Sequence, residues 1–132
     1  MKREEILSLA AERAFRTLNF TPGPSRMQRN VQKRAAIAVA MKPYCSHYEI
    51  GDIIQRDRTA VYHYLQHHEN NMKHWKGYAE FYLSVKPGLD EILADYNIQQ
   101  KIDQIEGEIT RLIQARDRIK AKLEITEDDK QG

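Results

Sequence analysis

Apolar side chains recur at alternating steps of four and three residues toward the C-terminal end of this chain. The seam consists of Ile98, Ile102, Ile105, Ile109, Leu112, Ile119 and Leu123, with one charged interruption at Arg116. A seven-residue repeat that lasts for about four heptads predicts a long helix with an apolar stripe along one side. This regularity constrains the fold more than any other feature, and it favours an all-α chain.

The seam has two alternative uses. With Ile102 at position a, it forms a dimeric coiled coil in which Lys101 at g can pair with Glu106 at e of a parallel partner. We expect self-association through residues 98–123 on this basis. In the alternative, the helix folds back in antiparallel orientation on the N-terminal helix of its own chain, because Ile113 widens the stripe beyond a strict seam.

Apolar residues at helical spacing predict helices in the rest of the chain as well. The expected segments are residues 3–18, 27–41, 46–54, 58–71 and 72–85. Residues 35–41 are apolar on every side, which is typical of a helix buried inside a helical domain. Proline and glycine mark the boundaries, with a linker or ordered loop at residues 19–25, a stop at Pro43 and a break at Pro87 and Gly88.

Residues 46–71 have the pattern of a helix-turn-helix. Ser46, followed three residues later by Glu49, forms a capping box that opens a short helix. Gly51 in that helix allows another backbone to approach closely. A tight turn follows, and Asp57 is a good N-cap residue for the next helix. A short helix, a tight turn and a longer helix together predict a helix-turn-helix.

Helical spacing divides the second of these helices into two faces. The inward face consists of Val61, Tyr64, Leu65 and His68. The outward face carries no acidic residue and consists of Arg58, Thr59, Tyr62, His63 and Gln66. Arginine can bond twice to guanine, glutamine twice to adenine, and a threonine methyl can touch the thymine methyl. The outward face therefore predicts reading of a DNA major groove, with an ordinary solvated helix face as the alternative.

Positive charge is concentrated in the middle of the chain. The net charge is only +2, but residues 22–76 hold nine Lys or Arg against four Asp or Glu, while residues 77–132 hold eight against twelve. A basic centre beside an acidic segment favours a polyanion-binding module. The candidate DNA-binding residues are Arg26, Arg29, Lys33, Arg34, Ser46, Arg56, Asp57, Arg58, Thr59, Tyr62, His63 and Gln66.

Two short stretches carry a resemblance to a known family. The sequence E-I-G-D at residues 49–52, followed by R-D-R-T-A-V-Y-H at residues 56–63, resembles the C-terminal DNA-binding domain of the bacterial replication initiator DnaA. The resemblance covers residues 26–70 and implies a helix-turn-helix related to that of the Trp repressor. It also implies base contacts from Asp57, Arg58 and Thr59. The family's minor-groove arginine corresponds best to Arg29, with Arg26 as the alternative.

The chain departs from the family pattern at three points. Arg58 replaces a histidine, Ala60 replaces a second threonine, and the turn before Arg56 is about one residue shorter. A changed side chain at a base-reading position changes the preferred base, so the DNA sequence that DnaA recognises does not carry over. The chain also has no G-x-x-x-x-G-K-[ST] loop, which excludes a full initiator ATPase.

Several functional classes have no support in the sequence. Cys45 is the only cysteine, so neither an internal disulfide nor a cysteine-based zinc site is expected. His63 and His67 lie one helical turn apart, but no second cluster of ligands completes a metal site. No motif groups a nucleophile with a base, and we expect a non-enzyme without cofactor or small-molecule substrate. Without a long apolar run or leader, the chain is expected to be cytoplasmic and not to bind a membrane.

These expectations divide the chain into three parts. Residues 1–86 form a helical domain with the helix-turn-helix at 26–71, residues 89–125 form the long C-terminal helix, and residues 126–132 form a disordered tail. The predicted function is binding of double-stranded DNA through the helix starting at Asp57, in replication or transcription control. The alternative is an oligomeric DNA-packaging adaptor or scaffold that resembles a small terminase subunit.

Overall fold

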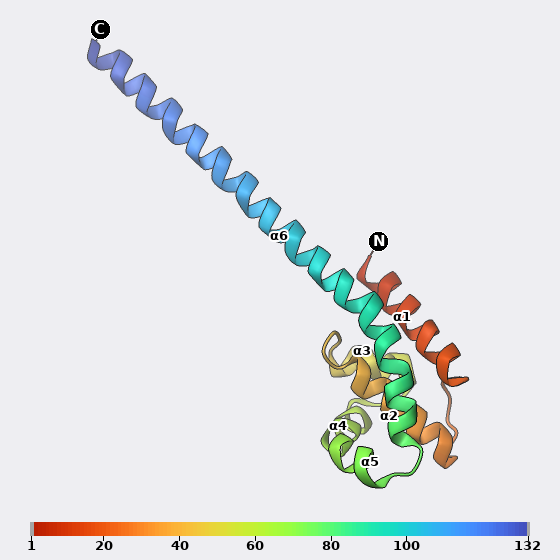
Figure 1. Ribbon diagram of the computed structural model, residues 1–132. Helices are drawn as coiled ribbons and strands as arrows, with labels where there is room; N and C mark the ends of the chain where they lie inside the picture. The colour runs from red at the N-terminus through yellow and green to blue at the C-terminus, as the bar shows by residue number, and fades with distance from the viewer. Residues whose placement is uncertain (1, 132) are drawn as a thin grey trace. The chain divides into compact units, whose positions relative to one another are not determined.

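The computed structural model describes residues 2–131, with side chains described from residue 2 to residue 125. Within that range the chain folds into six helices and no strand (Figure 1). The helices are α1 (Arg3–Leu18), α2 (Gln28–Met41), α3 (His47–Ile54), α4 (Arg58–Gln66), α5 (His68–His74) and α6 (Tyr78–Gln131). The expected all-α class is confirmed. None of the helices described combines the length and the apolar character that a membrane span requires.

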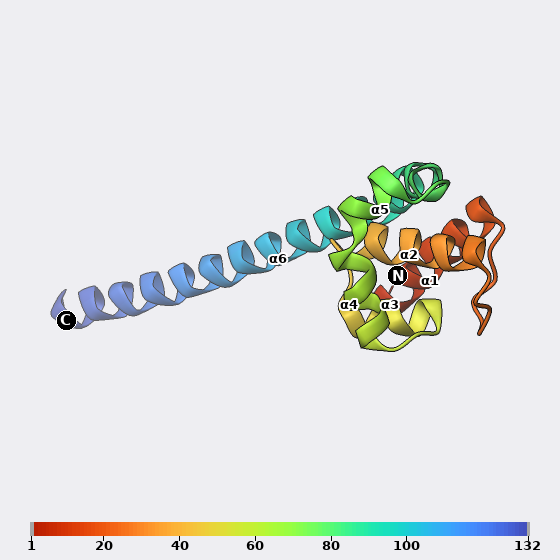
Figure 2. The same cartoon turned by 90° about the horizontal axis from the view of Figure 1, so that it is seen from below.

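The chain divides into two compact units, Met1–Asn97 and Ile98–Gly132. In the first unit, α2, α3 and α4 pack against one another (Figure 2). Every residue of Ala35–Met41 in α2 is buried except Val39, as the apolar sequence predicts. This helix is the centre on which the helix-turn-helix is built, because α3 and α4 both contact it.

The first turns of α6 complete the core of this unit. One hydrophobic cluster joins Leu7, Ala10, Ala14 and Leu18 of α1 with Val85, Leu89 and Leu93 of α6. An ion pair of 3.0 Å between Arg13 and Glu91 links the same two helices. Residues 85–93 therefore cover the apolar face of α1.

Pro87 lies inside α6, so the helix break expected at Pro87 and Gly88 is wrong. Proline removes one backbone hydrogen bond and costs about 3 kcal/mol in a helix interior. Val85 and Leu89, on either side of the proline, are both buried in the core, and this packing offsets that cost. The Pro87 ring itself is exposed. On this exposed side of the helix, water can hydrate the backbone carbonyl that has lost its hydrogen bond to the proline nitrogen.

The single helix expected over residues 58–71 is divided in two. α4 ends at Gln66, and His67 has a non-helical backbone with φ −97° and ψ 4° before α5 begins at His68. The His68 side chain is half-buried, and its Nδ1 shares a hydrogen bond of 2.7 Å with the Tyr78 hydroxyl. Burial lowers the pKa of His68 below its ordinary value and raises that of Tyr78.

The helix expected over residues 72–85 is interrupted as well. Gly77 has a φ of +93°, a conformation that side chains other than glycine rarely adopt. The amide of Gln32, buried in α2, donates to the Lys76 carbonyl at 2.7 Å and holds this turn against the core. α6 begins directly afterwards, at Tyr78.

In the second unit α6 continues as helix, and its apolar seam is exposed. The seam residues Ile98, Ile102, Ile105, Ile109, Leu112, Ile119 and Leu123 have exposed fractions between 42% and 65%. The expected long helix is thus present. The disordered tail expected over residues 126–132 lies outside the residues whose side chains are described.

Candidate nucleic-acid interface

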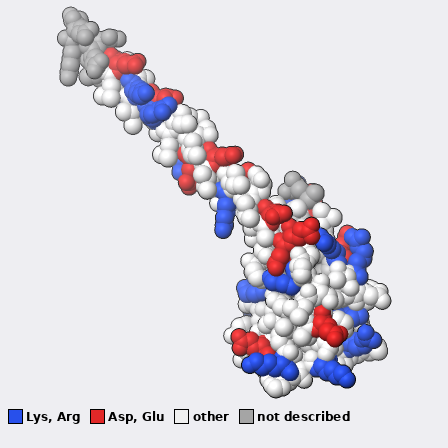
Figure 3. Space-filling model, viewed as in Figure 1, with Lys and Arg blue, Asp and Glu red and all other residues white. Residues whose placement is uncertain are grey.

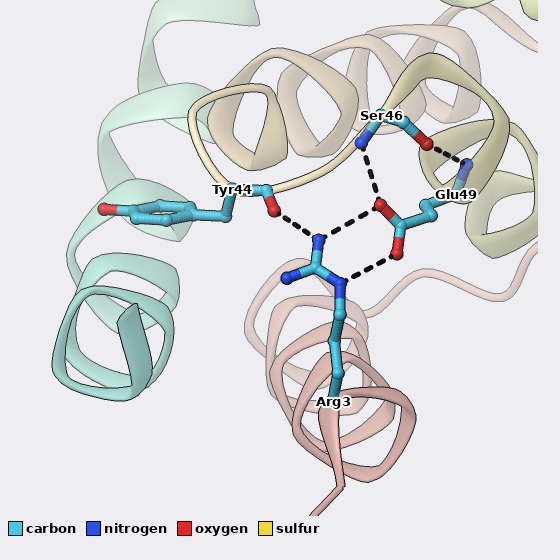
Figure 4. Close-up of polar contacts among 4 residues, drawn as sticks. All are labelled: Arg3, Tyr44, Ser46 and Glu49. Atoms are coloured by element: carbon cyan, nitrogen blue, oxygen red, sulfur yellow. Dashed lines mark hydrogen bonds and ion pairs between the residues drawn. The ribbon is translucent and has the colours of Figure 1, made fainter. Parts of the chain in front are cut away.

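The start of α3 is fixed by a network of four residues (Figure 4). The Ser46 hydroxyl accepts a hydrogen bond from the Glu49 amide at 3.2 Å, and the Glu49 carboxylate accepts one from the Ser46 amide at 2.9 Å. Arg3 of α1 donates to both Glu49 oxygens and to the Tyr44 carbonyl. The Arg3 hydrogen bond and the one from the Ser46 backbone hold the pKa of Glu49 below its ordinary value. The expected capping box is confirmed, and α1 braces it.

The turn between α3 and α4 is tight and depends on one glycine. Gln55 adopts the left-handed conformation with φ 57°, and the Arg56 amide donates to the Gly51 carbonyl at 2.9 Å. A Cβ on Gly51 would lie 2.6 Å from the Arg56 carbonyl oxygen, so the close backbone approach expected there is present. The Asp57 carboxylate accepts from the Ala60 amide at 2.9 Å and caps α4, as expected.

α4 presents the two faces that its spacing predicts. Val61 is fully buried, and Tyr64 and Leu65 pack against the core while half-buried. The exposed side chains of α4 are Arg58, Thr59, Tyr62, His63 and Gln66. In the part of the chain that the structure describes, no other helix covers any of the five expected groove-reading residues.

Two residues of α3 belong to this face and were missed at the sequence level. The Arg58 guanidinium lies 4.9 Å from the ring centroid of Tyr48 and donates a hydrogen bond to its hydroxyl. The Tyr62 ring meets His47 edge-on, with 6.0 Å between centroids. The capping box places His47 and Tyr48 in the first turn of α3, which is the signal that could have identified them.

A shallow cleft of about 380 Å³ opens where α3 and α4 meet. It is lined by Tyr48, Gly51, Asp52, Arg56, Asp57, Arg58 and Thr59. The cleft therefore contains two carboxylates beside its two guanidinium groups. On the face shown in Figure 3, basic and acidic side chains are likewise interspersed over the first unit.

Arg34 does not belong to this surface, which corrects the sequence-based expectation. Its exposed fraction is 2%, and its guanidinium donates to the Gly23 carbonyl at 3.1 Å and to the Ser25 carbonyl at 3.0 Å. The same group lies 5.8 Å from the ring centroid of Phe20. Arg34 anchors the loop before α2 from inside, because two loop carbonyls accept hydrogen bonds from one nitrogen of its guanidinium, while its buried Nε has no hydrogen-bond partner among the described residues.

Arg56 ties the same loop to the helix-turn-helix. It is half-buried and donates to the Ser25 carbonyl at 3.4 Å and to the Gln55 carbonyl at 2.8 Å. Arg26 follows Ser25 directly and is exposed. The loop therefore presents Arg26 close to the turn that leads into α4.

The two other expected cations of this region lie on another side of α2. Lys33 is half-buried, donates to the Asn19 carbonyl at 3.4 Å and lies 5.5 Å from the Phe81 ring centroid. Arg29 is exposed and lines a hollow of about 310 Å³ together with Lys33, Asn19 and Phe81. Lys33 thus interacts with the C-terminal end of α1 and the N-terminal end of α6, whereas Arg29 remains accessible to solvent.

A second cleft, of about 420 Å³, contains three histidines, one of which is His63 of the outward face of α4. It is lined by Val31, His63, Tyr64, His67, Asn70, Asn71, His74 and Trp75. The rings of His63 and His67 lie 4.3 Å apart. Among the described residues, however, no three His, Cys, Asp or Glu side chains are arranged to hold a metal ion.

Cys45 is buried, and burial raises the pKa of its thiol to about 11.

Comparison of the chain with protein-family models, with curated proteins and with solved structures finds no match. The resemblance to the DnaA domain therefore depends on the motif residues alone.

Proposed function

We propose that this chain binds double-stranded DNA and reads the major groove with the outward face of α4. The observation that carries this proposal is the accessibility of Arg58, Thr59 and Tyr62 in the first two turns of a helix that follows a fixed, tight turn. In helix-turn-helix proteins, the N-terminal residues of the second helix contact base edges. A DnaA-like motif at the same positions supports the proposal.

The proposal assigns different roles to the residues of this face. Arg58 bonds to a guanine edge, and Tyr48 orients its guanidinium for that contact. Thr59 contacts a thymine methyl, while Tyr62, His63 and Gln66 extend the contact along the groove. Asp57 and Ser46 act as helix caps, because their side-chain oxygens already accept backbone amides.

The loop before α2 and the first turn of α2 supply contacts to the DNA backbone. Arg26, which is presented next to the turn, and Arg29, at the start of α2, neutralise phosphates or enter the adjacent minor groove. Arg56 positions this loop through its bond to Ser25. Such contacts orient the protein on the duplex and make its affinity depend on salt.

Self-association is the second part of the proposal. One helix-turn-helix reads few base pairs, and two copies joined through residues 98–123 would bind paired half-sites with much higher affinity. A DNA-binding dimer of this kind would act in replication or transcription control.

Titration of fluorescent duplexes with the full-length chain over a salt series tests the proposal. We expect affinity that falls steeply with salt and that differs between sequences selected from a random duplex pool and scrambled controls. Absent binding, or binding that is indifferent to both salt and sequence, would reject it.

The exposed seam also supports a second candidate, an oligomeric DNA-packaging adaptor. In that case assembly is the primary role and DNA reading is loose. Light scattering separates the candidates, because a ring-sized oligomer favours the adaptor and a dimer favours the regulator.

A further inference from the structure

We propose that residues 98–125 of two chains pair as a parallel, in-register, two-stranded coiled coil, and that Lys101 and Glu106 select the parallel orientation. This inference rests on the self-association part of the proposed function, and it names the partner as a second copy of the chain. It does not depend on DNA binding.

The exposed side chains of this segment require a partner. Besides the seam, Ile113 is 43% exposed and Ile125 is 62% exposed. A helix that leaves such a long apolar stripe in water gains little stability from helix propensity alone, since most helical stability in proteins comes from burying an apolar face. A second copy presents the same stripe with the same heptad spacing, and so covers it along its whole length.

The layers of a parallel pair are well defined. Position a holds Ile102, Ile109, Arg116 and Leu123, and position d holds Ile98, Ile105, Leu112 and Ile119. Each of these residues then faces its own equivalent in the second copy. Gly107 falls at position f, away from the seam, and a Cβ built there meets no atom within 4 Å. The glycine, which weakens the helical segment 98–125, thus lies outside the contact.

Charge distinguishes the parallel from the antiparallel pair. In the parallel pair, exposed Lys101 at g faces exposed Glu106 at e of the second copy. The two-fold symmetry of the pair repeats this attraction, so it occurs twice. In the antiparallel pair with the same overlap, g positions face each other, which places Lys101 opposite Lys122 of the second copy. The parallel orientation replaces two like-charge contacts with two opposite-charge contacts.

Isoleucine occupies most of positions a and d, which by itself favours three or four strands, and Arg116 opposes that preference. It lies at position a with its side chain 60% exposed and forms an ion pair of 3.3 Å with Asp117. A long cationic side chain at a can extend along the edge of a two-stranded coil and keep its charged group in water. Assemblies of more strands enclose position a more fully, so a single charged residue there specifies the smaller oligomer at a cost in stability.

A disulfide experiment on the full-length chain tests orientation and register together. Ile105→Cys places a thiol at position d, which faces itself only in the parallel, in-register pair. Under oxidised glutathione we expect a covalent dimer from I105C and none from the matched control G107C at position f. Native Cys45 is buried and does not compete. If I105C alone stays uncoupled but couples to R116C in a mixture, the pair is antiparallel and the proposal is rejected.

Charge reversal tests the role assigned to Lys101 and Glu106. K101E should raise the dimer dissociation constant about tenfold, and K101E/E106K should restore it, because the double variant returns opposite charges to facing positions. Sedimentation without DNA measures both effects. A monomeric wild-type chain, or a double variant no tighter than K101E, would overturn the proposal while leaving the DNA titration to be judged separately.

Discussion

The guanidinium of Arg58 stacks over the ring of Tyr48, 4.9 Å from its centroid, and donates a hydrogen bond to its hydroxyl. The two residues lie ten positions apart, on either side of the turn between α3 and α4. A flexible arginine loses side-chain entropy when it binds a base, whereas one already held in place loses less. Under the proposed function, this contact therefore makes α3 part of the DNA-binding surface.

Removing the Tyr48 hydroxyl should weaken DNA binding without unfolding the protein. Tyr48→Phe keeps the ring under Arg58 but loses one hydrogen bond, a change of about 1 kcal/mol or roughly fivefold in affinity. Tyr96→Phe on α6 is the matched control and should bind like the wild type. Fluorescence anisotropy measures both, and an unaltered Y48F affinity would remove Tyr48 from the surface.

Substitution of Arg58 should affect DNA binding in a different way from substitution of Arg26, in the loop, or Arg29, in the first turn of α2. Arg58→Ala should reduce the preference for the selected sequence by about 1–3 kcal/mol, because it removes a base contact. Arg26→Ala or Arg29→Ala should weaken binding to all sequences alike and lower the salt slope by about one. Affinities for selected and scrambled duplexes at several salt concentrations separate these outcomes. A uniform loss in R58A would mean that Arg58 contacts only the backbone.

Gly51→Ala should destabilise the first unit. The added Cβ would lie 2.6 Å from a backbone carbonyl, which cannot move aside as a side chain can, so we expect a cost of about 1–3 kcal/mol. Urea unfolding followed by circular dichroism gives this value.

Gly107→Ala provides the opposite case. It adds the same methyl group inside a helix where nothing lies within 4 Å, and should increase stability by about 0.5–1 kcal/mol. Equal effects of the two substitutions would show that the close approach at Gly51 does not determine its identity.

The stability of the first unit should decrease as the pH falls below about 6.5, the ordinary pKa of an imidazole. Burial lowers the pKa of His68 in the folded state, so the unfolded state binds the proton first. The stabilising contribution is present above the unfolded-state pKa and is lost as the pH falls through the folded-state pKa. Protonation also removes the acceptor that Nδ1 can offer to the Tyr78 hydroxyl.

Urea unfolding between pH 7.5 and 5.5 measures this effect. Glu49 and Asp90, whose pKa values are also lowered, lose their contributions only at more acidic pH. His68→Gln keeps a hydrogen-bonding side chain that does not titrate, and its stability should vary less over the same range. Parallel curves for the two proteins would exclude His68 as the source.

Local signals predicted the parts of this fold that depend on neighbouring residues. The capping box at Ser46, the cap at Asp57 and the close approach at Gly51 each follow from a few adjacent residue types and are all present. The two faces of α4 follow from helical spacing in the same way. Local patterns are reliable here because each interaction spans only one or two turns.

The features that depend on distant residues were not predicted. Arg34 is a charged residue that the sequence placed at the surface, and its burial is explained only by its hydrogen bonds to the loop carbonyls of Gly23 and Ser25. Pro87 is a residue that ordinarily ends a helix, and α6 continues through it because the residues on both sides pack in the core. The partnership of Tyr48 with Arg58 likewise appears only when α3 and α4 are brought together.

The loop that carries Arg26 is held from two sides, by buried Arg34 and by Arg56, which both donate to the Ser25 carbonyl. An arm anchored in this way has already lost its conformational freedom before it meets a duplex. Association with a DNA duplex should therefore show a modest change in heat capacity, proportional to the apolar area covered. It should lack the large additional decrease that accompanies the folding of a disordered segment upon its target.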